Sequence, residues 1–70
     1  MTDIKNAIVE IYMHGQLHYV CVSQLHYGDV FYDSDNNMWL ADTEPYIESD
    51  RWTIGASAIG YKSNIGDKIK

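Results

Sequence analysis

The chain has 70 residues, of which 46% are apolar, and its single cysteine excludes an internal disulfide. This length allows one domain over residues 1–70, with a core near the lower limit for a fold without disulfides or metals, and the apolar content argues against a disordered acidic tail. The chain shows neither a secretory signal nor an apolar run long enough to cross a membrane, so we expect a cytoplasmic protein.

The net charge of −5 is concentrated in the middle of the chain. Seven carboxylates and no lysine or arginine lie between Asp29 and Asp50, whereas residues 51–70 carry a net positive charge. Affinity for nucleic acids and for anionic membranes comes largely from Lys and Arg side chains. The layout therefore disfavours direct binding to either and favours a basic protein partner or a cation.

Residues 3–13 fit two different periods. A helix here would begin at Thr2 or Asp3, end at Gly15 and bury a stripe formed by Ile4, Ala7, Ile8 and Ile11. A strand would instead bury one face formed by Ala7, Val9, Ile11 and Met13. We favour the helix because both of its end signals are present.

The rest of the chain predicts strands and turns. The expected strands, rich in β-branched and aromatic residues, cover residues 17–24, 30–33, 38–41, 46–48 and 52–61. Residues 34–37 indicate a hairpin loop, and Pro45 ends the strand before it or places that strand at an edge. Gly55 and Gly60 indicate a bulge or a close backbone approach.

The polar residues 62–70 predict a flexible tail. Together these elements predict an α+β fold, in which one N-terminal helix packs on a small antiparallel sheet of four or five strands.

Six of the central carboxylates form pairs two residues apart, namely Asp33 with Asp35, Asp42 with Glu44, and Glu48 with Asp50. In extended backbone such residues point to the same side, about 6.5 to 7 Å apart. This spacing is comparable to that of neighbouring phosphates along a nucleic-acid strand, so the pairs predict a surface that faces a DNA-binding groove. The alternative is that they are turn and edge residues that keep a small protein soluble.

A cation site between Asp33 and Glu44 stays an open alternative. The spacing of oxygen-bearing side chains there is similar to that of an EF-hand loop, but Met38 occupies the position that needs glycine. His14, His18 and His26 lack a surrounding ligand set, so we expect surface or half-buried strand residues. Cys21 has no cationic neighbour in sequence and is expected to be an inert core thiol. We therefore expect no catalytic residue, metal or cofactor.

A series of short segments recurs in an order known from another protein family. They are Met1-Thr2-Asp3-Ile4 with Ala7-Ile8, Gly15-Gln16-Leu17, Tyr32-Asp33, Met38, Leu40, Asp42, Pro45-Tyr46, Trp52, Asn64, Gly66 and Lys68-Ile69-Lys70. In this order, and with several gaps, they resemble the phage-encoded inhibitors of uracil-DNA glycosylase, which are DNA mimics. The resemblance spans most of the chain.

The resemblance implies a non-enzymatic inhibitor in the host cytoplasm. In the family, an edge strand enters the DNA-binding groove of the glycosylase, and an apolar pocket grips a loop residue of the enzyme. Ser23 and Gln24 match part of the edge-strand motif, but its glutamate has no counterpart here. This chain is also shorter, and the family's second, acidic helix would fall in the region that is lost.

The expected partner-binding residues combine both arguments. The carboxylate pairs contribute Asp33, Asp35, Asp42, Glu44, Glu48 and Asp50, and the resemblance adds Ser23 and Gln24 together with a pocket formed by Met38, Leu40 and Ile54. Asp42 would lie close to that pocket. The expected partner is a basic DNA-binding host protein, with uracil-DNA glycosylase as the most specific candidate. The alternative is a small β-rich interaction module that inhibits another host defence or nucleic-acid-binding protein.

Overall fold

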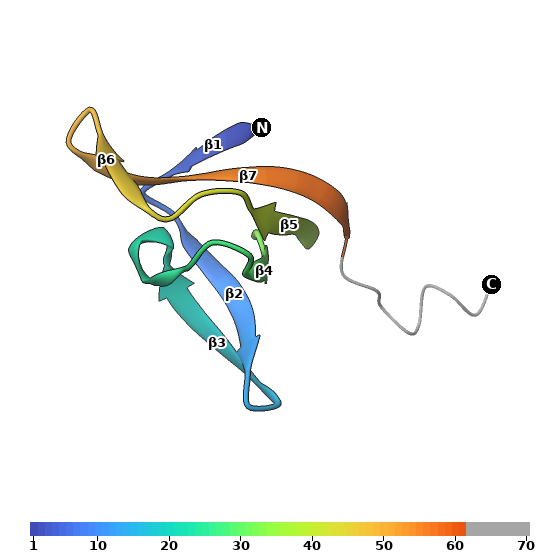
Figure 1. The fold of residues 1–70 in the computed structure, drawn as a ribbon. Coiled ribbons are helices and arrows are strands. Elements are labelled where there is room, and N and C mark those ends of the chain that lie inside the picture. The colour runs from blue at the N-terminus through green and yellow to red at the C-terminus, as the bar shows by residue number, and fades with distance from the viewer. Residues whose placement is uncertain (62–70) are drawn as a thin grey trace.

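The computed structural model describes residues 1–61, which form an all-β structure (Figure 1). One antiparallel sheet contains seven strands, interrupted by one 3-10 turn: β1 (Thr2–Lys5), β2 (Ile8–Met13), β3 (Gln16–Cys21), η1 (Val22–Gln24), β4 (Val30–Tyr32), β5 (Asn37–Ala41), β6 (Tyr46–Glu48) and β7 (Arg51–Tyr61). The described residues include no helix long and apolar enough to cross a membrane. The tail predicted for residues 62–70 lies outside the described residues.

The predicted α+β class and the N-terminal helix are wrong. Residues 3–13 belong to two strands, separated by a bend at Asn6, whose φ of 49° is left-handed. His14 and Gly15, with φ of 53° and 80°, form the two-residue turn of the β2–β3 hairpin. A left-handed glycine ends a helix and closes such a turn equally well. Pairing of β1 with β7 and of β2 with β3 decides between the two.

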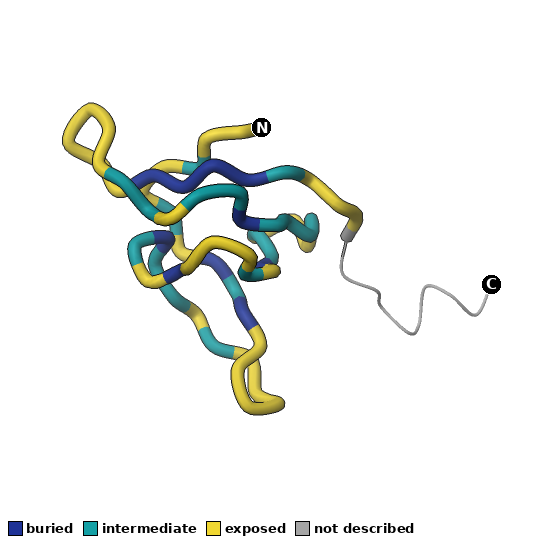
Figure 2. The backbone as a smooth tube through the Cα atoms, viewed as in Figure 1, coloured by how far each residue is buried: buried dark blue, intermediate teal, exposed yellow. Residues whose placement is uncertain are grey.

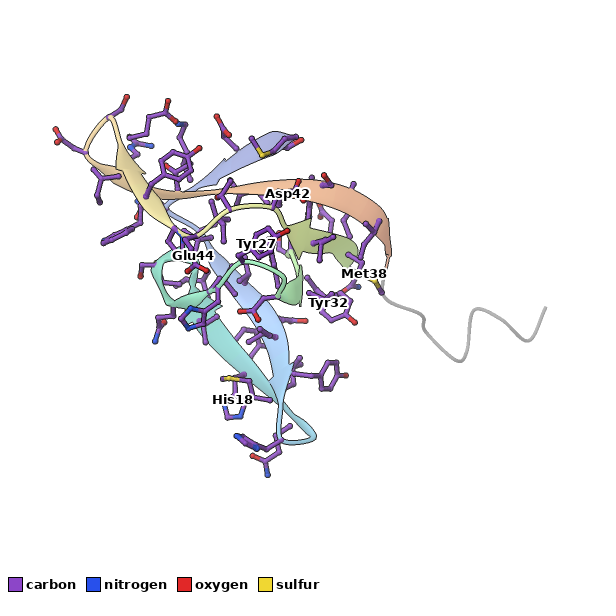
Figure 3. The ribbon with its side chains drawn as sticks, in the orientation of Figure 1. His18, Tyr27, Tyr32, Met38, Asp42 and Glu44 are labelled. Atoms are coloured by element: carbon purple, nitrogen blue, oxygen red, sulfur yellow. The ribbon has the colours of Figure 1, made fainter. Side chains whose placement is uncertain are left out.

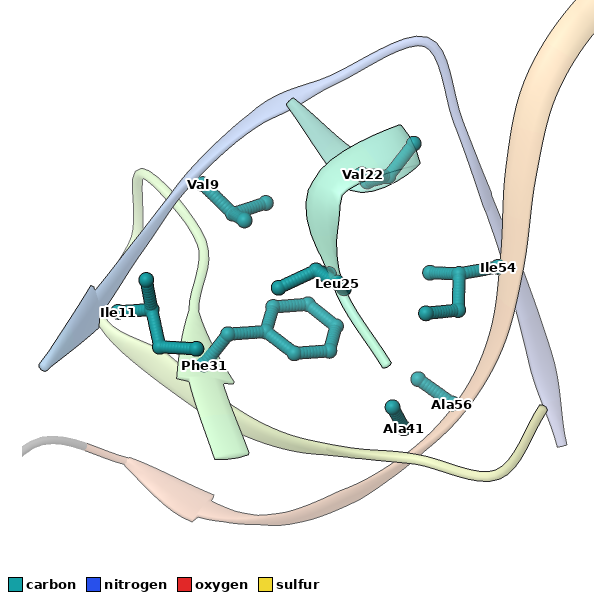
Figure 4. Packing of buried hydrophobic residues seen from close by; sticks show 8 residues of the cluster. All are labelled: Val9, Ile11, Val22, Leu25, Phe31, Ala41, Ile54 and Ala56. Carbon is teal, nitrogen blue, oxygen red and sulfur yellow. The ribbon is translucent and has the colours of Figure 1, made fainter. Parts of the chain in front are cut away.

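The sheet curls so that its ends come together. The strand order is β1-β7-β5-β4-β2-β3, and β6 pairs with β7 beside this path. Because only Asn6 and Ala7 separate β1 from β2, the chain itself joins two distant positions of the sheet. Figure 4 shows the resulting ring of strands around the buried side chains. The sheet contains more strands than the four or five expected because the residues assigned to the helix form β1 and β2, whereas β6 matches the strand expected at residues 46–48.

The core fills the inside of this curved sheet. Phe31 lies at its centre with no exposed surface, and Figure 2 shows the buried backbone concentrated in the middle of β7 and in β2. The turn η1 contributes the buried Val22, and Leu25 follows directly after it. The other buried apolar residues of the described chain are Val9, Ile11, Ala41, Ile54 and Ala56.

The hairpin and glycine predictions are confirmed. β4 and β5 pair as a hairpin around residues 33–36, with Asn36 in the left-handed region. Gly60, with φ of 145°, lies beside a bulge: Trp39 pairs with Ala58 while Met38 pairs with Gly60, so Ile59 has no opposite residue. At Gly55 an added Cβ would approach the Sδ atom of Met1 to 2.6 Å, which is the close approach that the glycine predicted.

Replacement of Phe31 by alanine is expected to unfold the domain. Such a truncation costs about 3 to 5 kcal/mol in a packed core. A chain of this size rarely has more than about 3 to 5 kcal/mol of stability in total. Phe31→Leu is the matched control and should retain a cooperative urea transition, followed by tryptophan fluorescence. Equal transitions for the two variants would contradict the central role of Phe31.

Candidate functional site

Asp33 organises the β4–β5 hairpin. Its Oδ1 accepts hydrogen bonds from the backbone N–H of Asp35 at 2.8 Å and of Asn37 at 3.0 Å. Its Oδ2 accepts from Asn37 Nδ2 at 3.1 Å and from the indole Nε1 of Trp39 at 3.0 Å. Both oxygens of this half-buried carboxylate are therefore used inside the fold, so Asp33 acts mainly on the turn rather than on a partner.

The same contacts explain the acidity of Asp33. Partial burial acts to raise its pKa, but the hydrogen bonds from Trp39, Asn37 and the turn backbone outweigh burial and hold the pKa below its usual value. The carboxylate stays ionised in the fold at lower pH than it would in the unfolded chain.

Asp42 and Glu44 lie in the irregular connection between β5 and β6. Asp42 Oδ2 accepts a hydrogen bond from the hydroxyl of Ser57 at 2.5 Å. Glu44 Oε2 accepts from the backbone N–H of Tyr27 at 3.0 Å, and its Oε1 lies 3.5 Å from His26 Nδ1. This second pair therefore ties the connection to β7 and to the loop before β4; Figure 3 labels both carboxylates and Tyr27.

Glu48 and Asp50 lie at the β6–β7 hairpin. Glu48 Oε1 is 2.6 Å from Lys5 Nζ, in an ion pair whose side chains are 37% and 47% exposed. Such exposed pairs contribute little to stability. Ser49 and Asp50, with φ of 53° and 63°, form the turn, and Asp50 is exposed there.

None of the three carboxylate pairs lies within a single strand. Five of the six members sit in turns and connections and Glu48 ends β6, at three separate places along the sheet, so the regular i, i+2 spacing of extended backbone does not apply to the pairs. Asp35 and Asp50 are the exposed members whose carboxylates accept no hydrogen bond within residues 1–61. The carboxylate pairs therefore do not form the phosphate-like row that their spacing in sequence predicted, and their charges are scattered over three places.

Apolar and aromatic side chains gather on the sheet surface that faces away from the core. Strand alternation and pairing register put ten residues of β2 to β5 on this side, of which Cys21 packs against the core. The other nine we call the outward face: Ile8, Glu10 and Tyr12 of β2, Leu17 and Tyr19 of β3, Val30 and Tyr32 of β4, and Met38 and Leu40 of β5. Among them, Tyr19 is 70% and Ile8 65% exposed. Eight of the nine are apolar or aromatic, and Glu10 is the exception.

Contacts across the strands join these residues into one surface. Tyr12 and Tyr32 meet edge to face, with ring centroids 6.2 Å apart. Tyr32 pairs with Met38 and Val30 with Leu40, and Figure 3 shows Tyr32 beside Met38. The tyrosines of this face were not among the expected partner-binding residues. A strand period over residues 8–13 places Tyr12 beside Ile8 and Glu10 on one face, and Tyr19 and Tyr32 follow from the same alternation in β3 and β4.

Met38 and Leu40 are half-buried on this outward face, next to Asp42, which follows at the same alternation. Ile54 is different, because its side chain is completely buried in the core. Its placement in the partner-binding pocket is therefore corrected: a partner cannot touch it without opening the fold.

Ser23 and Gln24 lie in η1 rather than on an edge strand. Gln24 Oε1 accepts a hydrogen bond from the backbone N–H of Cys21 at 2.9 Å. Hydrogen bonds from the Ser23 hydroxyl and backbone N–H hold the pKa of the Cys21 thiol below its usual value. Ser23 and Gln24 thus support the turn that ends β3. The Cys21 side chain is half-buried and packs against the core.

The histidines are spread over the turn of the β2–β3 hairpin, β3 and the loop before β4. Within residues 1–61 no group of three His, Cys, Asp or Glu side chains is arranged to hold a metal ion. Strand β5 occupies the middle of the stretch from Asp33 to Glu44. The side-chain oxygens at the two ends of this stretch therefore do not converge as they would in an EF-hand loop.

An open depression of about 370 Å³ lies under the β2–β3 hairpin. Its polar side chains are Gln24, His26 and Asp29, and its apolar wall includes Ile11, Met13 and Val20. Gln24 is bonded to Cys21, and Asp29 Oδ2 accepts from the backbone N–H of His26 at 2.8 Å. These groups serve the loop itself and do not form a nucleophile–base pair.

Comparisons with protein-family models, with curated proteins and with solved structures found no match to this chain. The resemblance to the glycosylase inhibitors therefore stays a prediction. The features of this chain that bear on its function are the outward face and the charges around it.

Asp33→Asn is expected to change the pH dependence of stability. Because the folded pKa of Asp33 lies below its unfolded value of about 3.9, the charged form stabilises the fold above about pH 4 and loses this effect as the pH falls through the folded pKa. The variant should lose roughly 1 to 3 kcal/mol at neutral pH, and its difference from the wild type should shrink in acid. Urea titrations across this pH range measure the effect.

Asp35→Asn is the matched control, since it makes the same change in the same turn at an exposed carboxylate. Because the Asp35 carboxylate accepts no hydrogen bond within residues 1–61, the stability of this variant at neutral pH should stay close to that of the wild type. Equal behaviour of the two variants would show that the hydrogen bonds to Asp33 do not stabilise the fold.

Proposed function

We propose that this chain is a non-enzymatic, phage-type inhibitor that occupies the DNA-binding groove of a basic host protein, with the outward face as its contact surface. The observation that carries the proposal is the exposed cluster of Ile8, Tyr12, Tyr19 and Val30 beside the half-buried Met38 and Leu40. Contiguous apolar patches on small proteins generally mark interaction sites. Tyrosines in particular are enriched where protein interfaces form.

The surrounding charge supports a basic partner. Residues 1–61 contain nine carboxylates against Lys5 and Arg51. The hydrogen bonds that Asp33 accepts hold its pKa below the usual value, so this carboxylate adds to the negative field of the molecule although it is used inside the fold. Such a field accelerates the approach of an oppositely charged protein.

The mechanism is competitive occupation. The carboxylates speed the encounter with a groove that is lined by Lys and Arg to hold phosphates. Burial of Met38, Leu40 and the neighbouring tyrosines then slows dissociation, because apolar anchors dominate off-rates. Asp42, beside Leu40, would meet the partner at the border of the apolar centre.

Uracil-DNA glycosylase is the target that the order of sequence landmarks suggests. A uracil-excision assay with purified glycosylase and graded amounts of this chain tests it. Stoichiometric loss of excision is expected. Full activity at a large molar excess of the chain would remove this target.

The second candidate is a β-rich module that inhibits another defence or nucleic-acid-binding protein. The scattered placement of the carboxylates favours it, because they do not form a row with the spacing of phosphates. Affinity capture against a panel of purified bacterial DNA-binding proteins separates the two candidates: the glycosylase alone should be retained under the first, and a different basic protein under the second.

Binding kinetics should separate the two parts of the surface. The association rate is expected to fall steeply with added salt, since steering is screened over about 8 Å at physiological ionic strength. Met38→Ala and Leu40→Ala should each raise the dissociation rate about ten-fold or more, which corresponds to about 1.4 kcal/mol, and leave association nearly unchanged. Surface plasmon resonance at several salt concentrations measures both rates.

Ile47→Ala is the control for these variants. Ile47 is 55% exposed on β6, where it pairs with Trp52 and does not belong to the outward face. It should leave both rates unchanged. Dissociation rates that respond equally to all three variants would place the contact surface elsewhere.

A further inference from the structure

β3 is an unprotected edge of the sheet. It pairs with β2 only, and β1 and β6 each pair with β7 only. β1 carries Asp3 and Lys5, and β6 carries Glu48, whereas β3 (Gln16–Cys21) contains no Asp, Glu, Lys, Arg or Pro. Charged residues and prolines are the usual means by which proteins keep an edge strand from pairing with another chain. Among the free edges of the described chain, β3 alone lacks this protection.

The hairpin turn determines which backbone N–H and C=O groups of β3 point away from β2, along the open edge of the sheet. With His14 and Gly15 as a two-residue turn, Met13 and Gln16 exchange backbone hydrogen bonds, and every second pair along the ladder does the same. The bond from Val22 N–H to Ala7 C=O, at 3.1 Å, has the same phase. The residues of β3 that bond to β2 are therefore Gln16, His18 and Val20, and those that point their N–H and C=O away from it are Leu17, Tyr19 and Cys21.

The backbone groups of β3 that point away from β2 are centred on Tyr19. At one end the N–H of Cys21 is already satisfied by Gln24 Oε1 at 2.9 Å, and the chain leaves the sheet through η1. At the other end the turn follows directly after Gln16. The open edge thus runs from Leu17 to Cys21, with Tyr19 in its middle and 70% exposed.

We propose that a second copy of this chain pairs with β3, antiparallel and about a two-fold axis at Tyr19, to form a homodimer. In this arrangement Tyr19 of each copy exchanges both backbone hydrogen bonds with Tyr19 of the other. The N–H of Leu17 donates to the C=O of Cys21 across the axis. The Cys21 N–H keeps its bond to Gln24, so the pairing disturbs no hydrogen bond within a copy.

The symmetry and charge of the edge favour a second copy over a strand of another protein. A two-fold contact requires a self-complementary edge, and an axis at Tyr19 places the N–H of Leu17 in each copy opposite the C=O of Cys21 in the other. Two copies of an acidic chain meet here without bringing charged side chains opposite each other. The outward face also becomes continuous across the axis, because Leu17 and Tyr19 lie on it, opposite Tyr12 and Glu10 of β2.

A charge-swap experiment at Tyr19 tests the dimer by sedimentation equilibrium from micromolar to millimolar concentration. The wild type is expected to reach twice the chain mass of 8.0 kDa. Tyr19→Lys and Tyr19→Glu should each sediment as monomers, because like charges directly opposite one another on paired strands oppose pairing. An equimolar mixture of the two variants should regain the mass of a dimer, which a variant that fails to fold would not do.

Ile47→Lys is the control, since it introduces a charge at an exposed position away from β3 and should stay dimeric. A wild type that remains monomeric throughout would overturn the proposal. So would single Tyr19 variants that still dimerise, or a mixture that stays monomeric. A monomer whose β3 amides become protected from hydrogen exchange only when another protein is added would assign the edge to that protein.

Discussion

Pairing of β7 on both of its edges is the constraint on which the rest of the structure depends. Ala56 is opposite Thr2 on one side and Ala41 on the other, and Thr53 is opposite both Lys5 and Tyr46. β7 therefore holds β1, β5 and β6 at once. Between β5 and β6 the chain remains bonded to it, through Asp42 N–H to Gly55 C=O at 2.7 Å and Gly55 N–H to Thr43 Oγ1 at 3.0 Å.

This arrangement determines what the outer surface can be. Trp39 and Ala41 face the core, so alternation turns Met38 and Leu40 outward. A single curved sheet of this length surrounds one core, and no second layer within residues 1–61 covers its outer side. Exposed tyrosines and aliphatic side chains on that side need another explanation, and contact with another molecule is the most direct one.

Local patterns predicted the second half of the fold better than the first. The hairpin around residues 33–36 and the irregularity at Gly60 follow from local residue types, because the backbone preferences of these residues fit only one structure at each position. At the N-terminus, Gly15 suits both a helix end and a hairpin turn, and only pairing with distant β7 and neighbouring β3 decides between them. Propensity cannot supply such non-local contacts, which is why the N-terminal strands were missed.

Several residues of the outward face could be predicted from the sequence, but the side of the sheet on which each residue lies could not. Met38, Leu40 and Asp42 were singled out from their order along the chain, and they lie on one side of β5. Ile54 was included because the family resemblance implied it, and order along the chain does not tell which residues of β7 face the core. Of the outward tyrosines, Tyr12 comes from the segment expected to be a helix, whereas Tyr19 and Tyr32 lie in expected strands whose outward side was not considered as a contact surface.

The carboxylates from Asp29 to Asp50 have two roles: they accept hydrogen bonds within the fold, and they give the molecule its negative field. Asp33 and Glu44 accept hydrogen bonds from backbone N–H groups, which stabilises turns and connections that a small core cannot hold alone. An accepting carboxylate prefers its ionised form, as the lowered pKa of Asp33 illustrates. At Asp33, the contacts that build the turn therefore also maintain the negative charge. A lysine or arginine placed among these residues would weaken that field, so the absence of basic residues from Asp29 to Asp50 fits a surface that attracts a basic partner.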